Sequence, residues 1–70
     1  MLAKFDCEKF RKERKKRITQ IKLAEQANTS VRYVRDLEHG IKKNPSATLL
    51  YQMAAAMGVP MDSFITEYEE

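Results

Sequence analysis

Apolar side chains recur at helical spacing along most of the chain, and near its middle they form two short stripes. The stripes consist of Leu23, Ala24 and Ala27 in one segment and of Val34, Leu37 and Ile41 in the next. Apolar residues at this spacing lie on one face of a helix. We therefore expect two short helices, about 20–27 and 31–39, that pack together through these faces.

A polar turn separates these two helices. Asn28, Thr29 and Ser30 carry side chains that compete for backbone hydrogen bonds, which favours turns and N-caps over helix interiors. Thr19 and Ser30 are the expected N-caps of the two helices, and Gly40 is the expected left-handed stop. The pattern predicts two helices joined by a tight turn.

Three more helices are expected outside this pair, so the predicted fold is all-α with five helices. The first runs from about residue 6 to 16, with Asp6 as its N-cap and Phe10 in the core. The fourth begins near Ser46 and ends at Gly58, and a short fifth helix covers about 61–65. The expected core residues of these last two helices are Leu49, Leu50, Met53, Ala54, Met57 and Phe64.

The chain of 70 residues is long enough for one small domain. We expect this domain to cover residues 1–65. Residues 1–4 are expected to fray or to lie against the core through Leu2, and the acidic tail 66–70 is expected to be disordered.

The charge of the chain is divided between its two ends. Residues 1–43 hold all 13 Lys and Arg and 6 acidic residues, a formal charge of +7, whereas residues 44–70 hold 4 acidic residues and no Lys or Arg, a charge of −4. A basic lobe beside an acidic lobe is typical of a nucleic-acid-binding domain, although a basic solvated face is the alternative for a charge run alone.

Several classes of function are disfavoured by composition. The single His39 and the single Cys7 give no metal or catalytic cluster, and no glycine-rich phosphate loop is present, so we expect neither an enzyme nor a cofactor. The longest apolar run, 53–57, is too short to span a membrane, and no signal peptide is visible. These features predict a cytosolic protein with no membrane partner.

The stretch TQIKLAEQANTSVRYVRDLEHG, residues 19–40, resembles the helix-turn-helix of the phage-repressor family, Cro/cI-type and also called Xre-like. The matching residues are Thr19, Gln20, Leu23, Ala24, Ser30, Val34, Leu37, Glu38 and Gly40. The resemblance continues through Asn44-Pro45-Ser46, Thr48-Leu49-Leu50, Ala54, Met57-Gly58-Val59 and Phe64. It covers nearly the whole chain and implies a compact five-helix, lambda-repressor-like domain that binds double-stranded DNA.

The resemblance implies that the helix over 31–39 enters the major groove and reads bases. The residues that it carries over for base contact are Val31, Arg32, Arg35 and Asp36. Each arginine can pair with guanine through two hydrogen bonds, with phosphate contact as the alternative for Arg35. Val31 can pack on a thymine methyl or be partly buried. Asp36 can accept a hydrogen bond from cytosine, but an ion pair with Arg32 one turn earlier is favoured.

A second set of residues is expected to contact DNA phosphates. Cations such as Lys22 in a first helical turn oppose the helix dipole, and an anionic partner would reverse that cost. Gln20 stands where the family uses a glutamine to bind phosphate and to brace a side chain of the second helix. The expected phosphate contacts are Arg17, Gln20, Lys22, Ser30, Tyr33, His39, Lys42, Lys43 and Asn44.

The resemblance also implies an ion pair between Arg14 and Glu38 that ties the first helix to the third. The connector between the first two helices departs from the family, because residues 15–19 are one residue short and lack glycine. The first helix must therefore end without the usual left-handed residue.

These observations predict a sequence-specific transcriptional regulator, and a repressor that occupies an operator is the favoured form. Weak binding by a single domain predicts a homodimer on DNA, with Phe64, Ile65 and Tyr68 as candidate interface residues. The acidic lobe is a candidate surface for a protein partner. An antitoxin-like protein that binds its own promoter and a toxin is the alternative.

Overall fold

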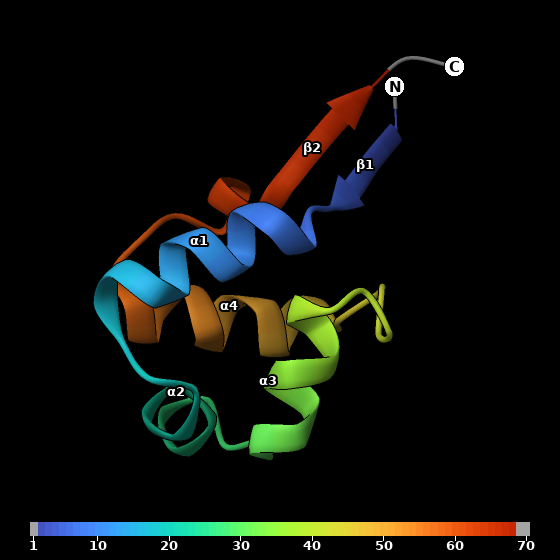
Figure 1. Ribbon diagram of the computed structural model, residues 1–70. Helices are drawn as coiled ribbons and strands as arrows, with labels where there is room; N and C mark the ends of the chain where they lie inside the picture. The colour runs from blue at the N-terminus through green and yellow to red at the C-terminus, as the bar shows by residue number, and fades with distance from the viewer. Residues whose placement is uncertain (1, 69–70) are drawn as a thin grey trace.

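The computed structural model describes residues 2–68. Its elements, in chain order, are β1 (Leu2–Phe5), α1 (Cys7–Arg17), α2 (Gln20–Gln26), α3 (Val31–Glu38), α4 (Ala47–Met57), the 3-10 helix η1 (Met61–Phe64) and β2 (Ile65–Tyr68). Figure 1 shows α1 lying above α4, with α2 and α3 at the lower part of the domain and the strand pair projecting from the opposite side.

Each α-helix begins at a side chain that accepts hydrogen bonds from first-turn backbone N–H groups. Asp6, Thr19 and Ser30 cap α1, α2 and α3, as the sequence predicted, and Ser46, near which the fourth helix was expected to begin, caps α4. The accepted bonds are 3.0 to 3.1 Å long. Each cap is typically worth about 1 kcal/mol relative to alanine, so the helix starts are fixed locally.

Three helices end through left-handed residues, and α1 ends differently. Asn28 (φ 57°), Gly40 (φ 75°) and Gly58 (φ 72°) follow α2, α3 and α4. After α1 the chain leaves through Ile18 in an extended conformation (φ −158°, ψ 150°). An extended residue needs no glycine, which explains how the short connector is accommodated.

The core is a single cluster contributed by every helix. Its buried members are Phe10, Leu23, Ala24, Ala27, Val34, Leu37, Leu50, Met53, Ala54, Met57 and Phe64. The expectation for Ile41 was wrong, because this side chain is 67% exposed. Gly40 turns the chain away from the α3 axis, so Ile41 does not continue the apolar stripe of that helix. Leu49 is only partly buried beside the core.

The expected helical architecture is present, but the expected count of five helices needs correction. The described residues contain four α-helices, while the predicted fifth helix is the 3-10 turn η1. Residues 2–5, expected to fray in part, and 65–68, assigned mainly to a disordered tail, form an antiparallel strand pair that joins Phe5 to Ile65 and Leu2 to Tyr68. Residues 69 and 70 of the predicted tail lie outside the described residues.

Asp6 joins this strand pair to the helices. Its backbone N–H donates to the carbonyl of Phe64 over 2.7 Å, and its carboxylate accepts a hydrogen bond from the Thr66 hydroxyl over 2.8 Å. The rings of Phe5, Phe10 and Phe64 pack next to these bonds, with centroids 5.5 and 5.3 Å apart in successive pairs. Both ends of the described chain are thus fastened to α1.

Candidate nucleic-acid interface

The two helices α2 and α3 pack together across the turn 27–30, as the sequence predicted. Val34, Leu37 and Glu38 form the inner, buried face of α3, whereas Arg32 and Arg35 are exposed on its outer side. No ion pair among the described residues involves either arginine. The outer surface of α3 therefore offers two uncommitted guanidinium groups.

The other two residues predicted to read bases are less open. Val31 is half-buried against the core, as one of its two expected roles requires, and its contact with a thymine methyl stays a prediction. Asp36 is also half-buried, and it does not form the expected ion pair with Arg32 in the structure. The backbone carbonyl of Asp36 instead accepts hydrogen bonds from the N–H groups of Ile41 and Lys42, which holds the loop after α3.

Glu38 is the only buried charged residue among those described, at 3% exposure, and three helices meet at its carboxylate. Arg14 from α1 donates through Nε to Oε2 over 2.5 Å and through Nη2 to Oε1 over 3.1 Å. Gln20 from α2 donates its Nε2 to Oε1 over 3.1 Å. The ion pair implied by the family resemblance is present in bidentate form, and it fixes α3 relative to both other helices.

Gln20 fulfils one of its two expected roles. One of its amide hydrogens is directed at Glu38, which leaves the second hydrogen and the amide oxygen for other partners. The role that the sequence implied for Gln20, as a brace for α3, is present in this bond. Its predicted phosphate contact stays a prediction.

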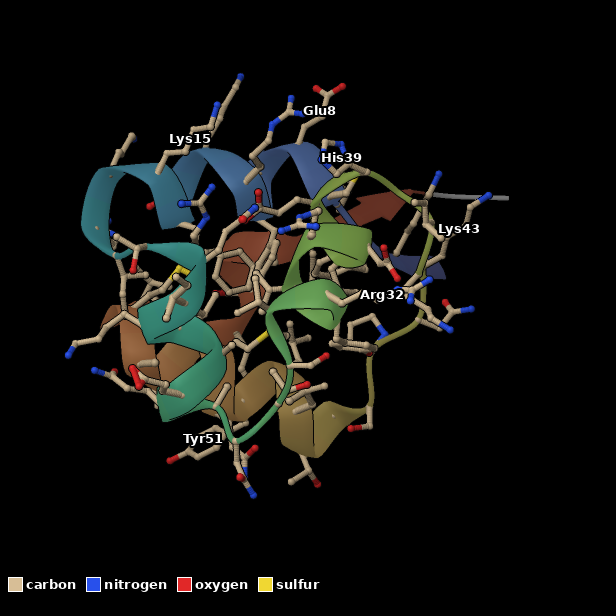
Figure 2. The ribbon with its side chains drawn as sticks, turned by 60° about the horizontal axis from the view of Figure 1, so that its bottom comes forward. Glu8, Lys15, Arg32, His39, Lys43 and Tyr51 are labelled. Carbon is tan, nitrogen blue, oxygen red and sulfur yellow. The ribbon has the colours of Figure 1, made fainter. Side chains whose placement is uncertain are left out.

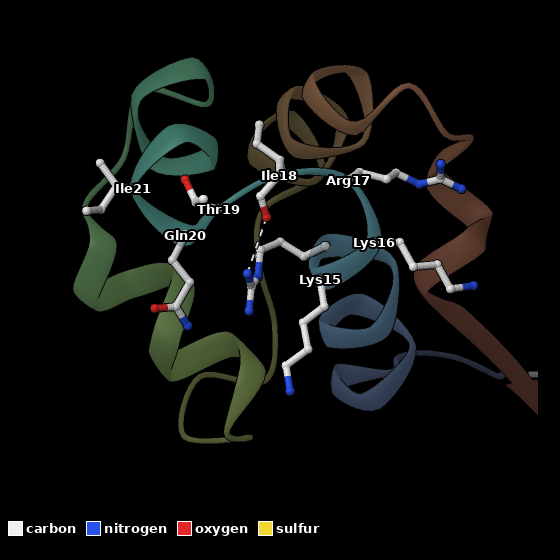
Figure 3. A pocket seen from close by; sticks show the side chains of 8 residues that line it. Lys15, Lys16, Arg17, Ile18, Thr19, Gln20 and Ile21 are labelled. Carbon is white, nitrogen blue, oxygen red and sulfur yellow. Dashed lines mark hydrogen bonds between the residues drawn. The ribbon is translucent and has the colours of Figure 1, made fainter.

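An open hollow lies where the C-terminus of α1 meets the N-terminus of α2, lined by residues 14–21 (Figure 3). Arg14 crosses this hollow and donates from Nη1 to the carbonyl of Ile18 over 3.2 Å. Lys15 and Gln20 extend in the same direction in this view, whereas Lys16 and Arg17 extend away from α2.

Arg17, one of the expected phosphate contacts, forms an ion pair within α1, and its phosphate contact stays a prediction. Its Nη2 lies 2.9 Å from Oε1 of Glu13, one turn earlier on α1. This pair lowers the pKa of Glu13 below its usual value, with the Arg17 hydrogen bond as the main cause. Lys15 is better directed and was not singled out, because a run of four basic residues gives no indication of which one faces the partner.

The remaining predicted phosphate contacts lie on or beside the helix-turn-helix. Lys22, Ser30, His39, Lys42, Lys43 and Asn44 are exposed, and Tyr33 is half-buried. Figure 2 shows His39 and Lys43 on the side of the domain that α3 and the following loop form, with Arg32 between the helix and this loop. Positive groups from separate segments thus lie around the outer surface of α3.

Phe64, Ile65 and Tyr68 were the candidate residues of a dimer interface. Phe64 is fully buried in the core, so it cannot contact a second copy directly, and that candidate was wrong. Ile65 is half-buried, and the side chain of Tyr68 lies outside those described.

Cys7 is a half-buried free thiol, and the described residues contain no group of three or more potential metal ligands. None of the described helices has the length and apolar character needed to cross a bilayer.

Comparison with known proteins agrees with this geometry. A family model described as helix-turn-helix matches residues 8–64. The chain is 42% identical over 58 residues to the immunity repressor protein of Bacillus phage phi105, covering 83% of this chain and 38% of that relative's length. The crystal structure of the restriction-modification controller protein C.AhdI from Aeromonas hydrophila shares the fold, with a TM-score of 0.75 and 24% identity over 83% of this chain and 88% of that one.

The packed helix pair and its exposed second helix define a DNA-binding helix-turn-helix domain. The chain belongs to the helix-turn-helix family of the phage-repressor, Xre-like type, which confirms the resemblance seen in residues 19–40. The two relatives are described as a repressor and as a controller protein, and neither description names a catalytic activity.

Proposed function

We propose that this protein is a sequence-specific regulator of transcription that binds double-stranded DNA with α3 in the major groove. The observation that carries the proposal is the exposed, unpaired state of Arg32 and Arg35 on a helix whose opposite face is locked into the core. A guanidinium group matches the O6 and N7 acceptors of guanine in the major groove. Holding α3 through Glu38 supplies the rigid placement that base recognition needs.

Phosphate contacts would position α3 over its site. Lys22 on α2 and Lys42, Lys43 and Asn44 in the loop after α3 have exposed side chains. Such contacts determine affinity and salt dependence but carry little sequence information. Lys15 joins this set because of its direction in Figure 3.

Repression is the form of regulation that we propose. The relative from phage phi105 is described as an immunity repressor, and the chain spans 38% of that protein. Occupation of an operator by this domain would exclude polymerase without any catalytic step. Neither relative's description mentions a toxin, so the antitoxin-like alternative is not proposed.

The proposal is tested by selecting sites from random duplex DNA with the wild type, Arg32→Ala and Lys43→Ala. We expect one palindromic sequence to be enriched by the wild type. In Arg32→Ala, the loss of a bidentate guanine contact should relax the selected sequence at one position and cost about 1–3 kcal/mol of binding free energy. Lys43→Ala is the matched control, because loss of a phosphate contact should weaken all sequences alike and make the salt dependence shallower.

Enrichment of no sequence by the wild type would contradict the proposal. An Arg32→Ala variant that selects the same site with the same stringency would remove Arg32 from the base-reading set. Circular dichroism of each variant checks that the exposed substitutions leave the fold intact.

A further inference from the structure

Most of the positive charge of the chain lies outside the helix pair that the proposed function uses. The segment 19–40, which holds α2 and α3, contains three basic and three acidic residues, so its formal charge is zero. Helix α1 contains seven Lys and Arg and two Glu, a formal charge of +5. The long-range attraction to phosphates therefore has its largest source in α1, a helix of which the proposed function uses only Lys15.

Some of the basic residues of α1 have acidic partners within the domain. Arg14 pairs with the buried Glu38, and both Lys16 and Arg17 pair with Glu13. The helix dipole favours cations in the last turn of α1, but this effect does not reach the middle of the helix. The basic residues of α1 that take part in no ion pair among the described residues are Lys9, Arg11, Lys12 and Lys15.

The contacts between α1 and α3 show on which side of α1 Arg11 lies. Arg14 donates to Glu38 of α3, and Sγ of Cys7 lies 3.8 Å from where a Cβ at Gly40 would be, just after α3. Arg11 is one helical turn from both Cys7 and Arg14, so it belongs to the same stripe of α1. Its half-buried side chain therefore lies along the interface between α1 and α3.

Arg11 and Lys15 are four residues apart and form one edge of α1, called here the α1 edge. In Figure 3, Lys15 extends in the same direction as Gln20, whereas Lys16 extends away from α2. Lys9 comes seven residues before Lys16, so the two lie within about 20° of each other around the helix, and Lys9 is about 160° from Arg11. The α1 edge thus faces the helix-turn-helix, and Lys9 lies on a different side.

The α1 edge lies at one end of the surface that would face DNA. Figure 2 shows Lys15 and Lys43 at opposite sides of the domain, with Arg32 nearer to Lys43. A duplex that is read by α3 would therefore leave the helix pair past α1. The phosphates nearest to the α1 edge would belong to DNA beyond the bases that α3 contacts.

We propose that Arg11 and Lys15 form a second DNA-contacting edge, which binds phosphates of the duplex that flanks the site read by α3. Four residues of a helix rise by about 6 Å, and over this length one DNA strand presents about two phosphates. DNA is favoured over an acidic protein as the partner because the α1 edge is continuous with the helix-turn-helix through the hollow that Lys15 and Gln20 line. The inference rests on the proposed function, which places α3 in the groove.

The test measures affinity for the selected site in two duplexes at about 0.1 M salt. One duplex ends at the site, and the other has about ten further base pairs, one helical turn, on each side. We expect the flanks to raise the affinity of the wild type at least about threefold, because each exposed ion pair adds a modest gain. Arg11→Gln should bind the short duplex as the wild type does and show a flank gain at least about twofold smaller.

Two further variants separate the position of the charge from its amount and from packing. Any cation gains from a longer duplex through the counterion atmosphere, so Lys9→Gln, which removes the same charge from another side of α1, is the matched control. Lys9→Gln should keep the flank gain of the wild type. Arg11→Lys should keep it too, because the lysine retains the charge. Thermal unfolding followed by circular dichroism checks that all variants fold.

A wild type whose affinity does not depend on the flanks would overturn the inference. So would equal reductions in Arg11→Gln and Lys9→Gln, or an Arg11→Lys variant that loses the gain as Arg11→Gln does. An Arg11→Gln variant with the full flank gain would also overturn it, and would leave an acidic protein as the partner that the α1 edge fits. Enrichment of no sequence by the wild type would instead overturn the proposed function, whereas a selected site without a flank effect overturns this inference alone.

Discussion

At the scale of single residues, Glu38 does most to explain how α3 is held. Its carboxylate is buried and accepts hydrogen bonds from Arg14 and Gln20, residues of two other helices. A buried charge is costly without such partners, and removal of one partner typically costs about 3–5 kcal/mol. The three side chains therefore act as one unit, and their value lies in fixing the orientation of α3.

Asp6 has a comparable role at the ends of the chain, and its effect depends on pH. The hydrogen bond from the Lys9 backbone N–H is the main cause that holds the pKa of Asp6 below its usual value of 3.8, and the Thr66 hydroxyl lowers it further. A group with a lowered pKa in the folded state contributes stability above its unfolded pKa. That contribution disappears as the pH falls below 3.8 and through the folded-state pKa.

We predict that Asp6→Ala lowers the free energy of unfolding at pH 7 by about 1 kcal/mol, the usual value of an N-cap. The difference between variant and wild type should narrow as the pH falls below 3.8. Urea unfolding followed by circular dichroism measures both quantities. A difference that stays constant from pH 7 to pH 2 would show that the charge of Asp6 has no part in the cap.

At the scale of elements, the two glycines after α3 and α4 have nearly the same left-handed conformation and can be compared directly. Gly40 and Gly58 have φ values of 75° and 72°, which side chains other than glycine adopt at a cost. A Cβ added at Gly40 would lie 3.8 Å from Sγ of Cys7, an ordinary contact, whereas nothing lies within 4 Å of one at Gly58. The backbone conformation therefore dominates at both positions.

We predict that Gly40→Ala and Gly58→Ala each lower the free energy of unfolding by about 1–2 kcal/mol, the cost of a left-handed residue with a Cβ. Thermal unfolding of the two variants beside the wild type measures this. A much larger loss for Gly40→Ala than for Gly58→Ala would mean that contact with Cys7, and not the backbone, sets the cost.

The elements also show what the sequence could and could not predict. The four α-helices and their caps follow from local chemistry, because Asp6, Thr19, Ser30 and Ser46 act on N–H groups two or three residues away. The strand pair was missed because four-residue segments at opposite ends of the chain carry too short an alternation. Their pairing depends on contacts with Asp6 and the Phe10 cluster that only the folded chain brings together.

The sequence predicted only part of the candidate site, because order and spacing do not show the direction in which each side chain extends. The family pattern placed Arg32 and Arg35 on α3 and implied the pair of Arg14 with Glu38, since these depend on order and spacing. It did not distinguish Lys15 from Arg17, which differ only in direction around the end of α1.

At the scale of the whole molecule, charge and shape divide the domain into two surfaces. Residues 1–43 carry a formal charge of +7 and include α3, whereas residues 44–70 carry −4. A basic surface attracts DNA over distances near the Debye length, and an acidic lobe is kept away from phosphates. For the proposed function, this division favours an approach in which the basic part of the chain, with α3, faces the DNA.

If Arg32 on α3 reads a guanine in the major groove, as we propose, the wild type and Arg32→Ala should respond differently to a change at that base. The affinities of wild type and Arg32→Ala are measured on the selected site with guanine and with 7-deazaguanine, which lacks the N7 acceptor, at the position that Arg32→Ala relaxes. We predict that 7-deazaguanine lowers the affinity of the wild type for the site at least about threefold, because one of the two hydrogen bonds of a bidentate contact is lost. The affinity of Arg32→Ala should be the same for both sites. Equal sensitivity of both proteins to the missing N7 would contradict the account.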